Sequence, residues 1–102
     1  MRKDNNGIYI SGKISNLDEN HARELFNDAE RMLCVAYPNR IVINPFNIRP
    51  LFGIKKYWFF MIADIYYLIF HCSDIFLLDN WKESKGAKIE LCVALLLNKT
   101  VL

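Results

Sequence analysis

Short apolar strands alternate with helical segments along this chain, and no other feature of the sequence limits its fold so strongly. The strands are expected at 7–11, 40–43, 73–78 and 99–102, and the helices at about 18–37, 57–71 and 84–98. Parallel strands need long crossover connections, so this alternation predicts a parallel sheet with helices on both faces. We therefore expect a single α/β domain over 1–102, after a polar tail at 1–6. Its doubly wound sheet has four strands in the order 2-1-3-4.

Length, charge and cysteine content exclude several classes of protein. The 102 residues suffice for one domain with its own core. A formal net charge of +2 is too balanced to predict binding to nucleic acid or to an anionic membrane surface. The three cysteines are scattered along the chain without metal-ligand spacing. Such cysteines are typical of proteins in a reducing compartment, where thiols stay free. We expect a cytoplasmic protein without a metal site.

The aromatic stretch at 57–70 is the most apolar part of the chain, and it carries Asp64 near its middle. A membrane-spanning helix needs roughly 20 apolar residues, so a buried helix is the better interpretation of this shorter stretch. Because the domain is small, we expect part of this helix to be buried against a second copy. The simplest such assembly is a two-fold homodimer, with a higher homo-oligomer as the alternative.

One carboxylate stands out within the helix expected at 84–98. Ser84 is a candidate N-cap for this helix. The residues expected on its buried face, from their spacing, are Ile89, Val93, Leu96 and Leu97. Glu90 lies among these apolar residues, where a carboxylate has to be paired, protonated or functional. The alternative is a glutamate in the first turn that the helix dipole favours.

In a doubly wound sheet the ligand site lies beyond the carboxyl ends of the strands, where the strand order reverses. In this chain that point falls between the first and third strands. The loops at 11–15 and 79–86 and the start of the Glu90 helix converge there. The sequence contains no glycine-rich dinucleotide fingerprint and no P-loop, so we expect no cofactor.

Several short motifs follow one another in a characteristic order. They are Ile8-Tyr9-Ile10-Ser11-Gly12, Asn44-Pro45, Asp64 ahead of a strand, and Trp81-Lys82-Glu83-Ser84-Lys85-Gly86-Ala87-Lys88-Ile89-Glu90. This set resembles the nucleoside 2-deoxyribosyltransferase superfamily, most closely its small uncharacterised branch, and also deoxynucleoside 5′-monophosphate N-glycosidases. The resemblance covers residues 7–102. It implies a flavodoxin-like fold and cleavage of an N-glycosidic bond.

The resemblance also implies roles for individual residues. Glu90 is the expected nucleophile at the anomeric carbon, Tyr9 holds it, and Asp64 contacts the base or assists proton transfer. Glycoside chemistry proceeds through an oxocarbenium-like transition state, which a nearby carboxylate can trap or stabilise. Tyr9 as an ordinary strand aromatic and Asp64 as a structural carboxylate remain open alternatives.

A second group of residues is expected to bind the substrate. Its members are Ser11, Gly12, Lys13, Trp81, Ser84 and Gly86. Ser84 and Gly86 begin a helix whose amino end offers backbone N–H groups to a phosphate. Lys13 is either a phosphate ligand or a solvated loop charge. Trp81 either stacks on a base or covers an edge of the core.

The leading expectation is a nucleoside or nucleotide N-glycosidase that favours hydrolysis over transfer. Cys92 motivates one alternative, a nucleotide-binding module without catalysis, because many active members have glycine at that position and a bulkier residue narrows the site. The other alternative is a structural protein whose aromatic helix forms an oligomer.

Overall fold

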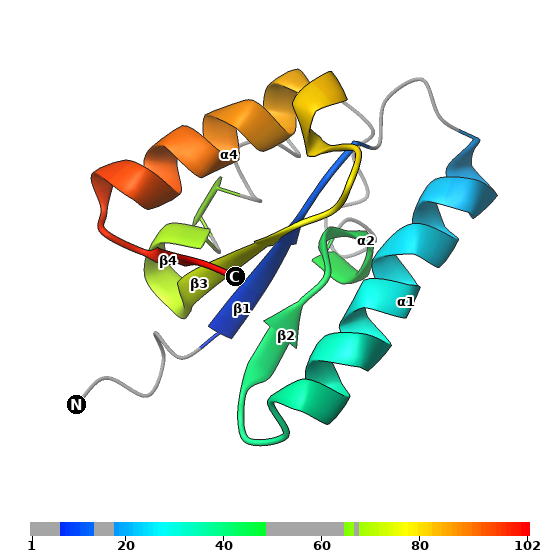
Figure 1. The fold of residues 1–102 in the computed structure, drawn as a ribbon, viewed down its shortest axis with the longest axis horizontal. Helices are drawn as coiled ribbons and strands as arrows, with labels where there is room; N and C mark the ends of the chain where they lie inside the picture. Colours follow the sequence, from blue (N-terminus) through cyan, green and yellow to red (C-terminus); the bar gives the residue numbers. More distant parts are fainter. Residues whose placement is uncertain (1–6, 14–17, 49–64, 67) are drawn as a thin grey trace.

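The structure, a computed structural model, describes residues 7–13, 18–48, 65–66 and 68–102. Its elements are β1 (Gly7–Ser11), α1 (Glu19–Ala36), β2 (Ile41–Ile43), α2 (Pro45–Ile48), β3 (Cys72–Leu77), the 3₁₀ helix η3 (Trp81–Glu83), α4 (Lys85–Leu96) and β4 (Thr100–Val101). Residues 65–66 and 68–71 are also helical. The alternation of strands and helices is thereby confirmed (Figure 1).

The four strands form one parallel sheet in the order β2-β1-β3-β4, as predicted. β1 lies in the middle of the sheet and pairs with β2 on one side and β3 on the other. Every residue of β1 is buried, which is typical of a central strand covered on both faces. The strand order reverses between β1 and β3, so their carboxyl ends define the switch point of the fold.

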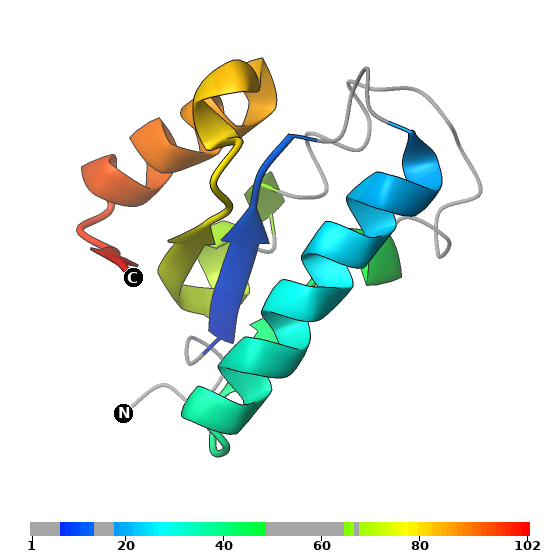
Figure 2. The ribbon, with the colours of Figure 1, turned by 45° about the vertical axis from the view of Figure 1, so that its right-hand side comes forward.

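Two helical layers enclose the sheet (Figure 2). On one face Ile8 and Ile10 of β1 pack with residues of α1, among them Phe26. On the other face Tyr9 packs with Leu68 and with Ala94 of α4. The split follows from the period of two along a strand, which sends alternate side chains of β1 to opposite faces.

Arg40 links strands at the end of the sheet where the strands begin. Arg40, which precedes β2, lies 2.6 Å from the Asp74 carboxylate and donates a 2.8 Å hydrogen bond to the Ser73 hydroxyl. Because Arg40 and Asp74 are both largely buried, this ion pair is less screened than one on the surface. It joins β2 to β3 at the edge opposite the switch point.

Helix α4 differs from its prediction in the face that it buries. The residues turned to the sheet are Gly86, Ala87, Glu90 and Ala94. The expectation that Ile89, Leu96 and Leu97 are buried is wrong, since they are 48%, 82% and 47% exposed. The helix is apolar on nearly all sides, so hydrophobic spacing does not identify the inner face. The small residues Gly86, Ala87 and Ala94 identify the inner face instead, because small side chains let a helix approach a sheet closely.

The predicted aromatic helix at 57–71 lies mostly outside the described residues. Its described part, residues 65–66 and 68–71, is helical as predicted. Leu68 is fully buried, whereas Tyr66 and Phe70 are exposed and their rings lie 5.1 Å apart. Within the described part of the chain, no helix has the length and apolar character needed to cross a membrane.

Cys72 provides a test of this packing. Its thiol is fully buried at the start of β3, and desolvation raises its pKa to about 12. Only the thiolate reacts with alkylating agents, so Cys72 is neutral and protected at pH 8. We expect iodoacetamide to label Cys34 and Cys92, both exposed, and to label Cys72 more than about 100-fold more slowly, because that reaction requires the core to open. Peptide mass spectrometry of the labelled native protein measures the three rates. Equal labelling of all three thiols would contradict this packing.

Candidate functional site

The side chain of Glu90 lies in the layer between α4 and β1 and is only 5% exposed. The Tyr9 hydroxyl donates a hydrogen bond to Oε2 of Glu90 at 2.8 Å, and the Ser11 hydroxyl donates one to Oε1 at 2.6 Å. Both donors are buried as well. The two donated bonds stabilise the ionised form of the carboxylate and fix its orientation.

Local sequence explains how these three side chains meet. Tyr9 and Ser11 are two residues apart on β1, so they point to the same face of the sheet. Gly86 and Glu90 are four residues apart on α4, so they share one face of the helix. Gly86 is buried in the first turn of the helix, and Glu90, one turn further on, reaches both hydroxyls. The expected contact between Tyr9 and Glu90 is present, and Ser11 joins it.

Gly12 continues the chain from β1 toward the switch point. A Cβ atom at this position would lie 2.6 Å from Cδ1 of Leu78, which is too close for any real contact. The N–H of Leu78 also donates to the carbonyl of Ser11 at 2.8 Å. Packing against Leu78 is therefore a structural reason for glycine here, and its role in substrate binding stays a prediction.

Lys13 joins the β1 loop to the loop that follows β3. Its backbone N–H donates to Oδ1 of Asn80 at 2.9 Å, and its Nζ lies 3.6 Å from Oε1 of Glu83. Glu83 is highly exposed, so this ion pair is weak and screened by solvent. Asn80 was not among the predicted site residues. Its place in the turn after a strand is the one sequence feature that could have identified it. Asparagine side chains in turns often form hydrogen bonds with neighbouring backbone groups.

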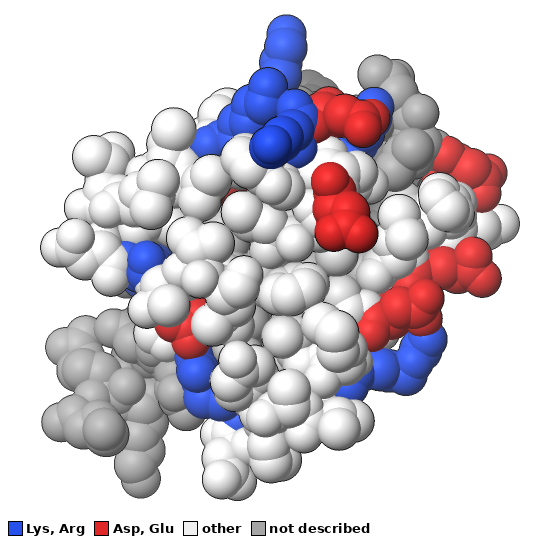
Figure 3. Space-filling model, in the orientation of Figure 1, with Lys and Arg blue, Asp and Glu red and all other residues white. Residues whose placement is uncertain are grey.

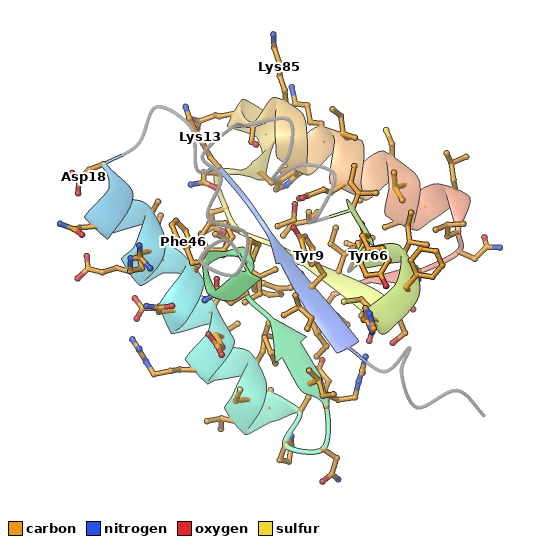
Figure 4. The ribbon with its side chains drawn as sticks, turned by 180° about the vertical axis from the view of Figure 1, so that it is seen from behind. Tyr9, Lys13, Asp18, Phe46, Tyr66 and Lys85 are labelled. Atoms are coloured by element: carbon orange, nitrogen blue, oxygen red, sulfur yellow. The ribbon has the colours of Figure 1, made fainter. Side chains whose placement is uncertain are left out.

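The amino end of α4 lies at the same edge as the carboxyl end of β1. In Figure 3 basic side chains gather at this end of the molecule. Figure 4 labels Lys13, which follows β1, and Lys85, which begins α4, at this end of the molecule. The structure thus brings positive charge from both predicted loops to one edge of the sheet.

Ser84 caps α4, as predicted. Its hydroxyl accepts a hydrogen bond from the N–H of Ala87 at 3.1 Å, and Gly86 is buried in the first turn. Trp81 begins η3 and is partly buried, with Nζ of Lys82 at 5.9 Å from its ring centroid. Phosphate binding by the Ser84 turn and base stacking by Trp81 remain predictions.

The Asn44-Pro45 motif has a structural role in the described residues. The side-chain amide of Asn44 is buried and donates to Oδ1 of Asn27 and to Oε1 of Glu30, at 2.9 and 3.0 Å. Its own Oδ1 accepts from the N–H of Phe46 at 3.0 Å, which begins α2. Asn44 therefore fastens the end of β2 to α1.

Two further expectations concern Asp64 and metal binding. Asp64 lies outside the described residues, so its relation to Glu90 stays a prediction. Among the residues that the structure describes, no three or more His, Cys, Asp and Glu side chains are grouped so that they could hold a metal ion.

Cys92 does not lie beside the carboxylate. Its side chain is exposed, on the side of α4 away from the buried Glu90. Two residues along a helix correspond to a rotation of about 200°, so the side chains point in nearly opposite directions. The expectation that a residue larger than glycine at position 92 narrows the site is therefore wrong.

One family of known proteins matches this chain over nearly its whole length. The model of a family described as a domain of unknown function, DUF4406, matches residues 6–102. No curated protein matches the chain, and no solved structure matches it.

The hydrogen bonds to Glu90 lead to a stability prediction. In Tyr9→Phe and in Ser11→Ala a buried carboxylate oxygen loses a donor, so each variant is expected to lose about 1–3 kcal/mol in free energy of unfolding. Urea denaturation followed by circular dichroism measures this loss. Tyr37→Phe, at the exposed carboxyl end of α1, is the matched control and is expected to change stability little. Losses no larger than that of the control would contradict the geometry.

Proposed function

We propose that this chain, which belongs to the DUF4406 family, is an N-glycosidase that hydrolyses the base–sugar bond of a (deoxy)nucleoside or its 5′-monophosphate. The observation that carries the proposal is the Glu90 carboxylate, buried at the switch point and held by the Tyr9 and Ser11 hydroxyls. A buried, oriented carboxylate in that place is typical of a catalytic group rather than of a surface charge.

The proposed reaction uses Glu90 as the nucleophile. Its carboxylate attacks the anomeric carbon of the sugar, a C–O bond forms, and the C–N bond to the base breaks. Water then attacks the same carbon and releases Glu90 and the free sugar. Tyr9 and Ser11 act as positioning residues, because their hydroxyls contact Glu90 and fix the direction of its oxygens.

The leaving base takes up a proton during this step. We propose Asp64 as the donor, on the resemblance described above. Asp64 stands in an apolar stretch of the sequence, and a carboxylic acid within reach of the base can protonate it as it leaves.

The charge at the amino end of α4 supports a phosphorylated substrate. Ser84 and Glu90 are six residues apart, or about 9 Å along a helix, a separation that a sugar and its phosphate group can span. The N–H groups of Lys85 and Gly86, at the start of the helix, and the Nζ of Lys13 are the proposed phosphate ligands. The weak ion pair of Lys13 with Glu83 is one that a phosphate can replace.

A nucleotide-binding module without catalysis is the second candidate. It is favoured by one observation: both oxygens of Glu90 already accept hydrogen bonds within the protein. In that case Glu90 would stabilise the fold or orient a ligand rather than attack it. For either function we propose a cytoplasmic location, in keeping with three free cysteines.

Glu90→Gln tests the leading proposal. The amide keeps the size of the side chain and removes the nucleophile, so base release is expected to fall at least about 1,000-fold. Chromatography of released base, from a pool of nucleosides, deoxynucleosides and 5′-monophosphates, measures the activity. Glu24→Gln, on the exposed side of α1, is the matched control and is expected to retain full activity.

Two outcomes would contradict this mechanism. If Glu90→Gln releases base as fast as the wild type, Glu90 is not the nucleophile. If the wild type releases no base but one nucleotide raises its melting temperature, the protein is the binding module.

Lys13→Met tests the choice of a phosphorylated substrate. Loss of the Nζ charge is expected to raise KM for the 5′-monophosphate about 10-fold, since one charge-assisted contact is lost. The KM for the corresponding nucleoside is expected to stay the same. Arg31→Met removes a positive charge from the exposed side of α1 and controls for net charge. An equal change in KM for both substrates would exclude Lys13 as a phosphate ligand.

A further inference from the structure

The outer side of α4 is an apolar surface without an explanation in the fold. Six residues of this helix are exposed, namely Lys85, Lys88, Ile89, Cys92, Leu95 and Leu96. At about 100° per residue they occupy one arc of the helix, opposite the residues packed on the sheet, with Cys92 near its centre. We call these six residues the α4 outer face.

The polar and apolar residues of the α4 outer face are separated along the helix. Both lysines lie in its first turn, and the remaining length is apolar. Leu96, in the last turn, is 82% exposed. Figure 3 shows basic side chains at the amino end of α4 and uncharged surface over its carboxyl half. A contiguous apolar helix face of this kind marks an interaction surface.

We propose that the α4 outer face is the interface of a two-fold homodimer, in which α4 packs antiparallel against α4 of a second copy. In this arrangement Ile89 of one copy packs against Leu96 of the other, and the two Cys92 side chains meet near the axis. The proposal is independent of the proposed function, because it uses the side of α4 away from Glu90.

Charge on the helix favours this partner and this direction. The last turn of α4 has no basic residue to complement its carbonyl groups. An antiparallel partner brings Lys85 and Lys88 toward that end, where a positive charge interacts favourably with the helix dipole. A parallel pair would instead place four lysines together.

Size and symmetry agree with a second copy. α4 has 12 residues, or about 18 Å of helix, and a stable interface buries about 800 Å² on each partner. The six exposed side chains of the α4 outer face supply part of that area. An isologous contact uses the same surface on both copies. It therefore buries the apolar surface of each copy and leaves none exposed to a third copy.

The test compares two exposed apolar positions. Leu96→Glu places a charge in the proposed interface, and Val35→Glu places one on α1 at a residue that is 83% exposed. We expect a dimer for the wild type and for Val35→Glu at tens of micromolar by light scattering. Leu96→Glu is expected to raise the dimer Kd at least about 100-fold and to appear monomeric. Circular dichroism verifies that each variant is folded.

Cross-linking tests the direction of packing. Cys34 and Cys92 are both exposed, so Cys34→Ser leaves Cys92 for a short bis-maleimide, and Cys92→Ser leaves Cys34. We expect a cross-linked dimer from Cys34→Ser and none from Cys92→Ser. A monomeric wild type, or a dimer that Leu96→Glu leaves intact, would overturn the proposal. Dissociation by Val35→Glu would also overturn it and place the contact on α1. Cross-linking through Cys34 alone would exclude the antiparallel α4 pair.

Discussion

The position of α4 on the sheet depends on the burial of a single carboxylate. A charge removed from water costs several kcal/mol unless hydrogen bonds replace its hydration. Glu90 meets this requirement through the hydroxyls of Tyr9 and Ser11. Those contacts are possible only where α4 lies directly over β1, and there the small residue Ala94 packs in one cluster with Tyr9. The contact therefore fixes the helix against the central strand and locates the candidate site.

The sheet could be predicted from the sequence because several constraints agree. Strands and helices alternate, crossovers are right-handed, and a strand buried on both faces is apolar throughout. The inner face of α4 could not be predicted in the same way. Hydrophobic spacing is informative only where a helix has a polar side, and here Ile89 and Leu96 are as apolar as the residues inside. The short elements α2 and η3 were not predicted, since local turn contacts such as that of Asn44 form them.

The candidate site was predictable to the extent that it depends on local spacing. Tyr9 and Glu90 were paired through the resemblance, and the period of two along β1 places Ser11 beside them. The contact of Ser11 with Glu90 was not expected, because a serine at the end of a strand serves a ligand equally well. Asn80 and Leu78 hold the loop through tertiary contacts. Such contacts leave no periodic trace in a sequence.

The two faces of α4 connect the candidate site with the proposed interface. The inner face carries the carboxylate and the small residues, and the outer face carries the apolar side chains. In an antiparallel pair, the carboxyl end of one α4 lies beside the amino end of the other. Ser84 caps the amino end of α4, and Lys13 and Lys85 lie near that end (Figure 4). Each candidate site would then lie next to the boundary between the two copies, so one helix would determine both the position of the carboxylate and the surroundings of the substrate.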